Sequence, residues 1–445
     1  MKKLLTIAAA LLIASNAFAQ EEKKGPDFTY GARAWVFGVM AGQDDFKEDY
    51  SHVRIRPMFT LGMEDVKIVT QLEMSQYFGR AADSGGTSDY SGPTSRNYKI
   101  KIREAYVDAK NVIMPGLSLA GGVKGYKFPW VIDNEYGLFT AGYNFGMGTA
   151  NLSYIKINEY NIVEQTDAGD KQNEDAQAYL LDVSVKVDDN ITVRPAVMFI
   201  QGGKDVPAGG LSGSGQNANN LYGTSLINAA VNVTGKVDIV SFNVTGAYLT
   251  GTLQKDAATD DKLKTSAYLF DLGVDAKATD MIKIGAFFTY GSGAGDKADK
   301  DNDYIGNMEM IFGRPTKSDG IGYGRLLVLE GASLIRNGGP YEDTFAMDTG
   351  LGYMSYGINV EAKIDKLTLF AQFGMASTID DDPNGKTSIG SEIDVRVSYA
   401  IASKTSLFLE CGYVLAGDIQ FNSKGDTTKD PENMYQIAWG ITSQI

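Results

Sequence analysis

Ten charged residues fall into two groups, most of them at alternating positions along the chain. The basic group is Arg33, Arg54, Arg56, Lys99, Lys101 and Arg103, and the acidic group is Glu392, Asp394 and Glu410, with Arg396 beside it. Side chains two positions apart in an extended strand point to the same face. If such faces line a pore, opposed charges across a constriction orient dipolar solutes and set ion preference. The alternative is that these ten residues are solvated lumen residues with no constriction near them.

Histidine, the usual partner of a catalytic nucleophile, is scarce. The chain has a single histidine, His52, and it contains no Gly-x-Ser-x-Gly sequence. Hydrolases need a base beside a nucleophile, so we expect no enzymatic activity and no cofactor. Asp299–Asp303 resembles the start of a calcium loop, but Tyr304 and Met310 stand where glycine and glutamate are required. We therefore predict no metal site.

Alternating segments must position the charged residues. In Ile389–Ile401, Ile393, Val395 and Val397 share one face, while the charged residues take the other. This period of two is typical of a strand. Eighteen such segments are present, most of them near the length that a tilted membrane strand requires. They are residues 28–40, 51–62, 66–78, 98–110, 117–126, 137–146, 149–160, 176–187, 191–201, 223–235, 238–250, 265–277, 281–290, 351–363, 367–377, 389–401, 405–415 and 433–445.

The connections between these segments alternate between tight and long. Tight turns include Met63–Asp65, Asp188–Asn190 and Asp365–Lys366. The long, polar connections are residues 79–97, 161–175, 202–222, 251–264, 291–350 and 416–432. Outer-membrane barrels have short periplasmic turns and longer extracellular loops. We therefore predict an all-β fold: a transmembrane, antiparallel, up-and-down β-barrel of about 18 strands. Because the inward set is charged and small, we expect a water-filled lumen.

The N-terminus predicts export. Lys2 and Lys3 precede a short apolar run, and Ala17–Ala19 has the pattern of a signal-peptide cleavage site. We assign residues 1–19 to a signal peptide, 20–27 to a periplasmic N-terminal segment and 28–445 to the barrel. The net charge of −14 argues against nucleic acid as a partner. Cys411 is the only cysteine and is interpreted as a small apolar residue.

The connection formed by residues 291–350 is too long for an ordinary loop. It contains the apolar runs 326–329 and 332–335, which would be a liability if exposed. It could fold inward and narrow the pore, pack on a neighbouring subunit, or extend the wall of the barrel. We favour the first of these.

Several segments resemble Gram-negative outer-membrane porins. These are Ile102–Ala109 with the glycine-rich Leu117–Tyr126, then Phe128–Glu135, Tyr143–Gly146 and the closing segment Tyr435–Ile441. The chain departs from the family at its end, where Ile445 replaces the usual phenylalanine. The resemblance implies a passive diffusion channel for small hydrophilic solutes, surrounded by membrane lipid and lipopolysaccharide, as a monomer or homotrimer. A structural conduit enclosing a partner protein, and a receptor or adhesin barrel, are the alternatives.

Overall fold

The computed structural model describes residues 26–43, 46–78, 99–158, 176–202, 225–256, 261–292, 300–301, 325–330, 352–381, 385–419 and 432–444. The strands are β1 Asp27–Gln43, β2 Phe46–Met63, β3 Val66–Phe78, β4 Lys99–Lys110, β5 Leu117–Phe128, β6 Ile132–Asn144, β7 Gly148–Asn158, β8 Ala176–Lys186, β9 Ile191–Gln201, β10 Ser225–Val237, β11 Val240–Asp256, β12 Asp261–Lys277, β13 Ile282–Gly291, β14 Lys300–Asp301, β15 Tyr353–Ile364, β16 Leu367–Ser377, β17 Ser388–Ala402, β18 Thr405–Ala416 and β19 Met434–Gln444. Among these described residues, no helix is long and apolar enough to cross a membrane.

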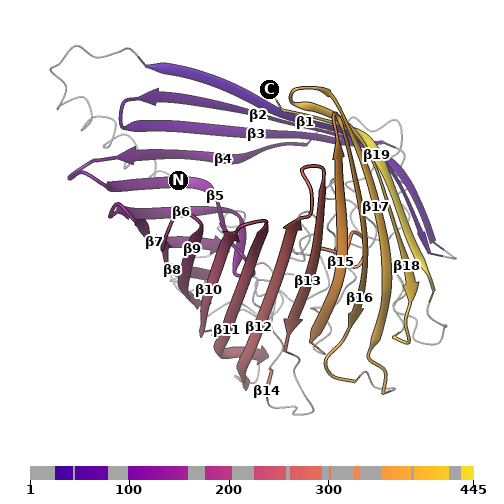
Figure 1. Cartoon of the computed structure of the whole chain (residues 1–445). Coiled ribbons are helices and arrows are strands. Elements are labelled where there is room, and N and C mark those ends of the chain that lie inside the picture. Colours follow the sequence, from indigo (N-terminus) through magenta and orange to yellow (C-terminus); the bar gives the residue numbers. More distant parts are fainter. Residues whose placement is uncertain are drawn as a thin grey trace, which may run out of the picture.

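The strands form one closed barrel. Each pairs antiparallel with its neighbours along the chain, and β1 also pairs with β19 over Arg33–Gly42. Figure 1 shows the strands following one another around the wall, with β19 beside β1. The two-residue β14 adds in parallel to β12, while β13 pairs directly with β15. The barrel therefore has eighteen antiparallel strands, which confirms the predicted fold, and each predicted segment coincides with one of them.

The two ends of the barrel differ. Tight connections such as Glu64–Asp65 and Asp365–Lys366 lie at the end where β1 begins and β19 finishes, which we call the turn end. The opposite end, the loop end, carries the long connections. The predicted loop 251–264 is wrong, because β11 and β12 continue pairing from Gly251–Thr265 to Asp256–Asp261. Leu253 lies opposite Leu263 in this extension of the ladder.

The outer face is apolar around the whole wall. On β17, Ile393 is 49 % exposed, whereas Glu392 on the inner face is fully buried. The same alternation recurs on every strand, with exposed side chains such as Leu181 on β8 and Ile358 on β15. Where β1 meets β19, the ring of Trp439 covers Gly38 and the ring of Tyr435 covers Gly42. A continuous apolar outer face is what a bilayer requires of a barrel.

On β8 to β12, the inner face is polar near the turn end but apolar nearer the loop end. The apolar inward residues of β8 to β12 are Ala178, Leu180, Ala196, Met198, Ile200, Leu226, Ala230, Ala247, Leu249, Ala267 and Leu269. All are buried in one cluster. The expectation that the inward set is charged and small is therefore wrong for this part of the wall. In these strands both faces carry apolar residues, so the alternating pattern alone did not reveal that the inner face is apolar.

Candidate functional site: the charged lumen

The hairpin β5–β6 leaves the wall and bends into the lumen. β4 pairs with β5 only up to Ala105–Val123, and β6 pairs with β7 only up to Gly137–Lys156, yet β5 and β6 stay paired to Phe128–Ile132. The bend begins at Gly122, whose φ of 132° is available to glycine but strained for other residues. Beyond it, Glu104 Oε1 accepts a hydrogen bond from Gly125 N at 3.1 Å, where the ladder has ended.

Apolar burial and ion pairs hold the hairpin inside. Its tip residues Phe128, Trp130 and Ile132 are buried and belong to the same cluster as the apolar inner face. Each such side chain contributes roughly 1.5–3 kcal/mol when fully buried. Tyr126 donates to Asp182 Oδ2 at 2.5 Å, and Arg194 binds both oxygens of the same carboxylate. The sequence suggested only a porin-like loop here; the glycines before the apolar tip were the available signal.

The basic group surrounds a buried carboxylate that the sequence analysis missed. Glu73 on β3 accepts from Arg56 Nε at 2.5 Å and from Arg103 Nη1 at 2.8 Å, and its Oε1 is 3.1 Å from Lys101 Nζ. Arg54 lies farther away, at 3.9 Å. Arg103 also donates to Glu135 of the hairpin, with Nε to Oε1 at 2.7 Å. Glu73 escaped notice because a single acid in an alternating strand has no distinctive pattern.

Two members of the basic group stand apart. Arg33 is exposed and lies opposite Arg56 in the β1–β2 register, so it shares the inner face. Lys99 pairs through its backbone with Ser75, and its side chain lies outside the described residues. The structure therefore brings Arg54, Arg56, Lys101 and Arg103 together around Glu73. This basic cluster, as we call these five residues, keeps an excess of positive charge.

The acidic group lies against residues 325–330, which belong to the long connection. Glu392 accepts from Val328 N at 2.6 Å and Leu329 N at 2.8 Å, and Asp394 Oδ2 accepts from Leu327 N at 3.2 Å. These carboxylates are buried. Glu410 instead accepts from Arg396 Nε at 3.2 Å. The acidic residues therefore bind other parts of the chain and are not free lumen charges.

Residues 325–330, which we call the inner segment, contact six strands of the wall, β13 among them through Arg325 over the Phe287 ring. Arg325 binds both oxygens of Asp271 on β12, at 2.8 and 3.0 Å. Gln372 on β16 donates to Arg325 O at 2.7 Å. Glu330 accepts from Tyr353 and Ser355 on β15, each at 2.5 Å, and also from the backbone of Arg325 and Leu326. With Glu392 on β17 and Gly412 on β18, the contacts span β12 to β18.

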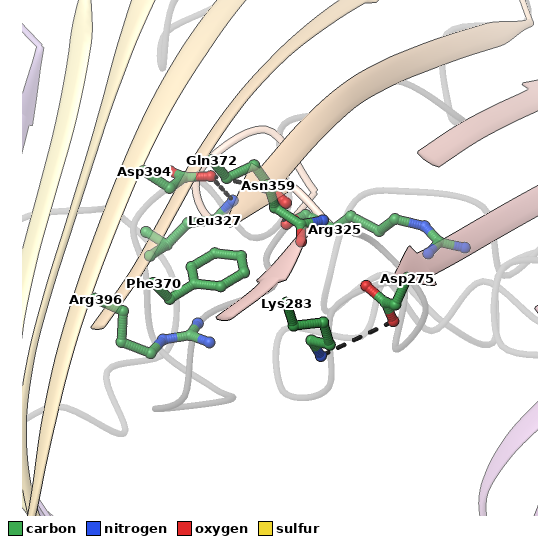
Figure 2. A pocket seen from close by; sticks show the side chains of 9 residues that line it. All are labelled: Asp275, Lys283, Arg325, Leu327, Asn359, Phe370, Gln372, Asp394 and Arg396. Atoms are coloured by element: carbon green, nitrogen blue, oxygen red, sulfur yellow. Dashed lines mark hydrogen bonds and ion pairs between the residues drawn. The ribbon is translucent and has the colours of Figure 1, made fainter. Parts of the chain in front are cut away.

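A pocket opens beside the inner segment on the lumen side. Its volume is about 240 Å³, and its lining residues are Asp275, Lys283, Arg325, Leu327, Asn359, Phe370, Gln372, Asp394 and Arg396. Figure 2 shows the Lys283 ammonium directed toward Asp275, at 3.9 Å. Arg396 lies over the Phe370 ring, with its guanidinium carbon 5.5 Å from the ring centroid. Hydrogen-bond donors and acceptors, both charged and neutral, thus surround a small open space.

Neither His52 nor Cys411 lines the pocket. His52 is buried with its ring edge-on to Phe37, at 4.9 Å between centroids. Within the described part of the chain, no group of histidine, cysteine and acidic residues is placed to hold a metal ion. Cys411 lies among the apolar residues of the outer face, beside Leu409 and Tyr413.

A closed eighteen-stranded barrel with an apolar outer face and a charged, partly filled lumen has the architecture of outer-membrane porins. The chain is similar in structure to OccK8 (OprE) of Pseudomonas aeruginosa, with 11 % identity, coverage of 94 % of this chain and 98 % of that chain, and a TM-score of 0.57. For OccAB1 of Acinetobacter baumannii these values are 10 %, 96 %, 99 % and 0.57. For Pseudomonas aeruginosa OpdK, solved with vanillate, they are 9 %, 94 %, 98 % and 0.55. No family model and no curated protein matches the chain.

Proposed function

We propose that this protein is an outer-membrane porin through which small hydrophilic solutes diffuse passively. One observation carries the proposal: charged side chains line the inside of a closed barrel whose outer face is apolar throughout. Placing an arginine or lysine on the lipid face would cost ~2–4 kcal/mol at mid-membrane, so the charges belong to a water-filled path. The outer face would contact membrane lipid and lipopolysaccharide, and the turn end would face the periplasm after removal of residues 1–19.

The solute path would run between the basic cluster and the pocket. The inner segment and the β5–β6 hairpin both occupy the lumen, so together they narrow this path. The pocket presents cationic Lys283 and Arg396 close to anionic Asp275. Such a site favours dipolar solutes, whose opposite ends can be held at the same time. Since OpdK was solved with vanillate, vanillate is a useful member of any solute panel.

The deciding experiment is single-channel recording of the purified protein in a planar bilayer. We expect steady ionic current that is interrupted by permeating solutes, tested with sugars, dicarboxylates, phosphate, zwitterionic amino acids and vanillate. A sealed barrel without current would support the conduit or receptor alternative instead. Light scattering of the detergent-solubilised protein distinguishes a monomer from a homotrimer.

The basic cluster predicts an effect on ion preference. Changing Arg54, Arg56 and Arg103 to glutamate should shift the reversal potential toward cation preference. Because that change would place three added carboxylates around Glu73, Lys101→Glu is the milder test: its side chain is 56 % exposed toward the lumen. The reversal potential in a salt gradient should move in the same direction, by less. Unchanged reversal potentials in both variants would remove the cluster from the permeation path.

A further inference from the structure

The inner segment is seated on glycines as well as held by carboxylates. A Cβ at Gly374 on β16 would lie 2.5 Å from Leu326 Cδ2, and one at Gly412 on β18 would lie 2.6 Å from Val328 Cγ2. A Cβ at Gly273 on β12 would meet the Arg325 guanidinium. Three strands therefore lack a side chain at the places where the inner segment touches the wall. Leu326 to Leu329 are buried in this seat, each at most 3 % exposed.

The carboxylates of this region bind the segment through its backbone. Three successive amides, those of Leu327, Val328 and Leu329, donate to Asp394 and Glu392. Glu330 closes the segment upon itself by accepting from the amide of Leu326 at 3.0 Å. Both oxygens of Glu392 accept from the segment, so this carboxylate has little left with which to bind passing ions.

We propose that Glu392, Asp394 and Glu330 are positioning residues: they dock the inner segment on its glycine seat, and the docked segment sets the pore width and completes the pocket. The inference rests on the proposed channel function and deepens it. Arg325 and Leu327 line the pocket only because the segment is docked. Releasing the segment should therefore widen the path for ions and remove part of the solute site. In a recording, the single-channel conductance should rise and the block of current by solute should fall.

The first test compares two lumen carboxylates. In Glu392→Gln, an amide nitrogen replaces one acceptor oxygen and faces an N–H donor. The inner segment should therefore lose a hydrogen bond to β17 and detach from the wall. Glu410→Gln removes a carboxylate from the neighbouring strand, where Glu410 accepts a hydrogen bond from Arg396. We expect Glu392→Gln to raise single-channel conductance and weaken solute block, while Glu410→Gln, which leaves the segment docked, shifts the reversal potential instead. Equal shifts of reversal potential, with unchanged conductance in both, would show that the carboxylates act as ion selectors and overturn the proposal.

The second test restores docking by other means. Cys411 is first replaced by serine. Val328→Cys and Gly412→Cys then place two thiols close enough to form a disulfide, because a Cβ at position 412 would approach residue 328. Combined with Glu392→Gln, the oxidised protein should regain wild-type conductance and solute block, and dithiothreitol should reverse both. Conductance that does not respond to reduction in the cross-linked protein would refute the proposal. Absence of current from the wild-type protein would instead refute the channel function itself.

Discussion

A single buried glutamate holds the basic cluster together. Glu73 is 3 % exposed and lies within ion-pair distance of Arg54, Arg56, Lys101 and Arg103. Glu73→Gln would leave the surrounding cations without their anion, and removal of one partner from a buried ion pair costs about 3–5 kcal/mol. We expect a loss of that order, measured as the free energy of unfolding in urea with the protein in lipid vesicles.

The matched control is Glu64→Gln, which removes the same charge from an exposed turn between β2 and β3. Its effect should remain within about 0.5 kcal/mol, as for most surface substitutions. Equal stability of both variants would mean that Glu73 does not organise the cluster.

The sequence predicted the positive side of this cluster from Arg54, Arg56 and Arg103. It could not predict the central anion, since pairing across strands depends on register.

The bend in β5 depends on one glycine. Gly122 has φ of 132°, and a Cβ there would collide with the Ala105 carbonyl oxygen. Gly122→Ala should straighten β5 and draw the hairpin tip out of the lumen, so we expect higher single-channel conductance. Gly121→Ala is the control, because its Cβ would meet Phe139 at an ordinary contact distance of 3.6 Å. Unaltered conductance in Gly122→Ala would show that the hairpin does not limit the path.

The seam between the first and last strands depends on glycine in another way. A Cβ at Gly38 would lie 2.5 Å from Trp439 Cζ2. Gly38→Val should displace that ring and impair pairing of β1 with β19, which heat-modifiable migration of the folded barrel on a gel would report. Gly246→Val adds the same side chain on the outer face of β11, where no heavy atom lies within 4 Å. If both variants migrate as the wild type does, the covering ring is dispensable.

The whole molecule predicts opposite tolerance for charge on its two faces. Ile393→Arg places a cation on the outer face of β17 and should lower the stability of the inserted barrel by ~2–4 kcal/mol if it lies near mid-membrane. Ser398→Arg places the same side chain on the inner face of the same strand and should cost much less. Folding yield into lipid vesicles at rising urea concentration measures both. Similar losses in both variants would contradict the assignment of the faces.

Strand positions and closure were accessible from sequence because alternation and turn residues are local properties. All eighteen predicted segments became barrel strands, and the polar face of β17 was correctly separated from its apolar face. The apolar runs of residues 291–350 favoured an inward fold, but the contacts made inside the lumen were not accessible. The inward bend at Gly122, the docking of Leu326 to Leu329 and the apolar inner faces of β8 to β12 depend on contacts between strands far apart in the chain. The roles of the ten pore-lining residues remain predictions.

The pairing of β1 with β19 also constrains the order of assembly. Arg33 finds its partner Gln444 only after the rest of the chain has been delivered. Until then, both first and last strands expose unpaired backbone, which hydrocarbon tolerates poorly. Shortened products lacking the final strand would therefore remain open-edged, and a cell could recognise and degrade them by that property alone.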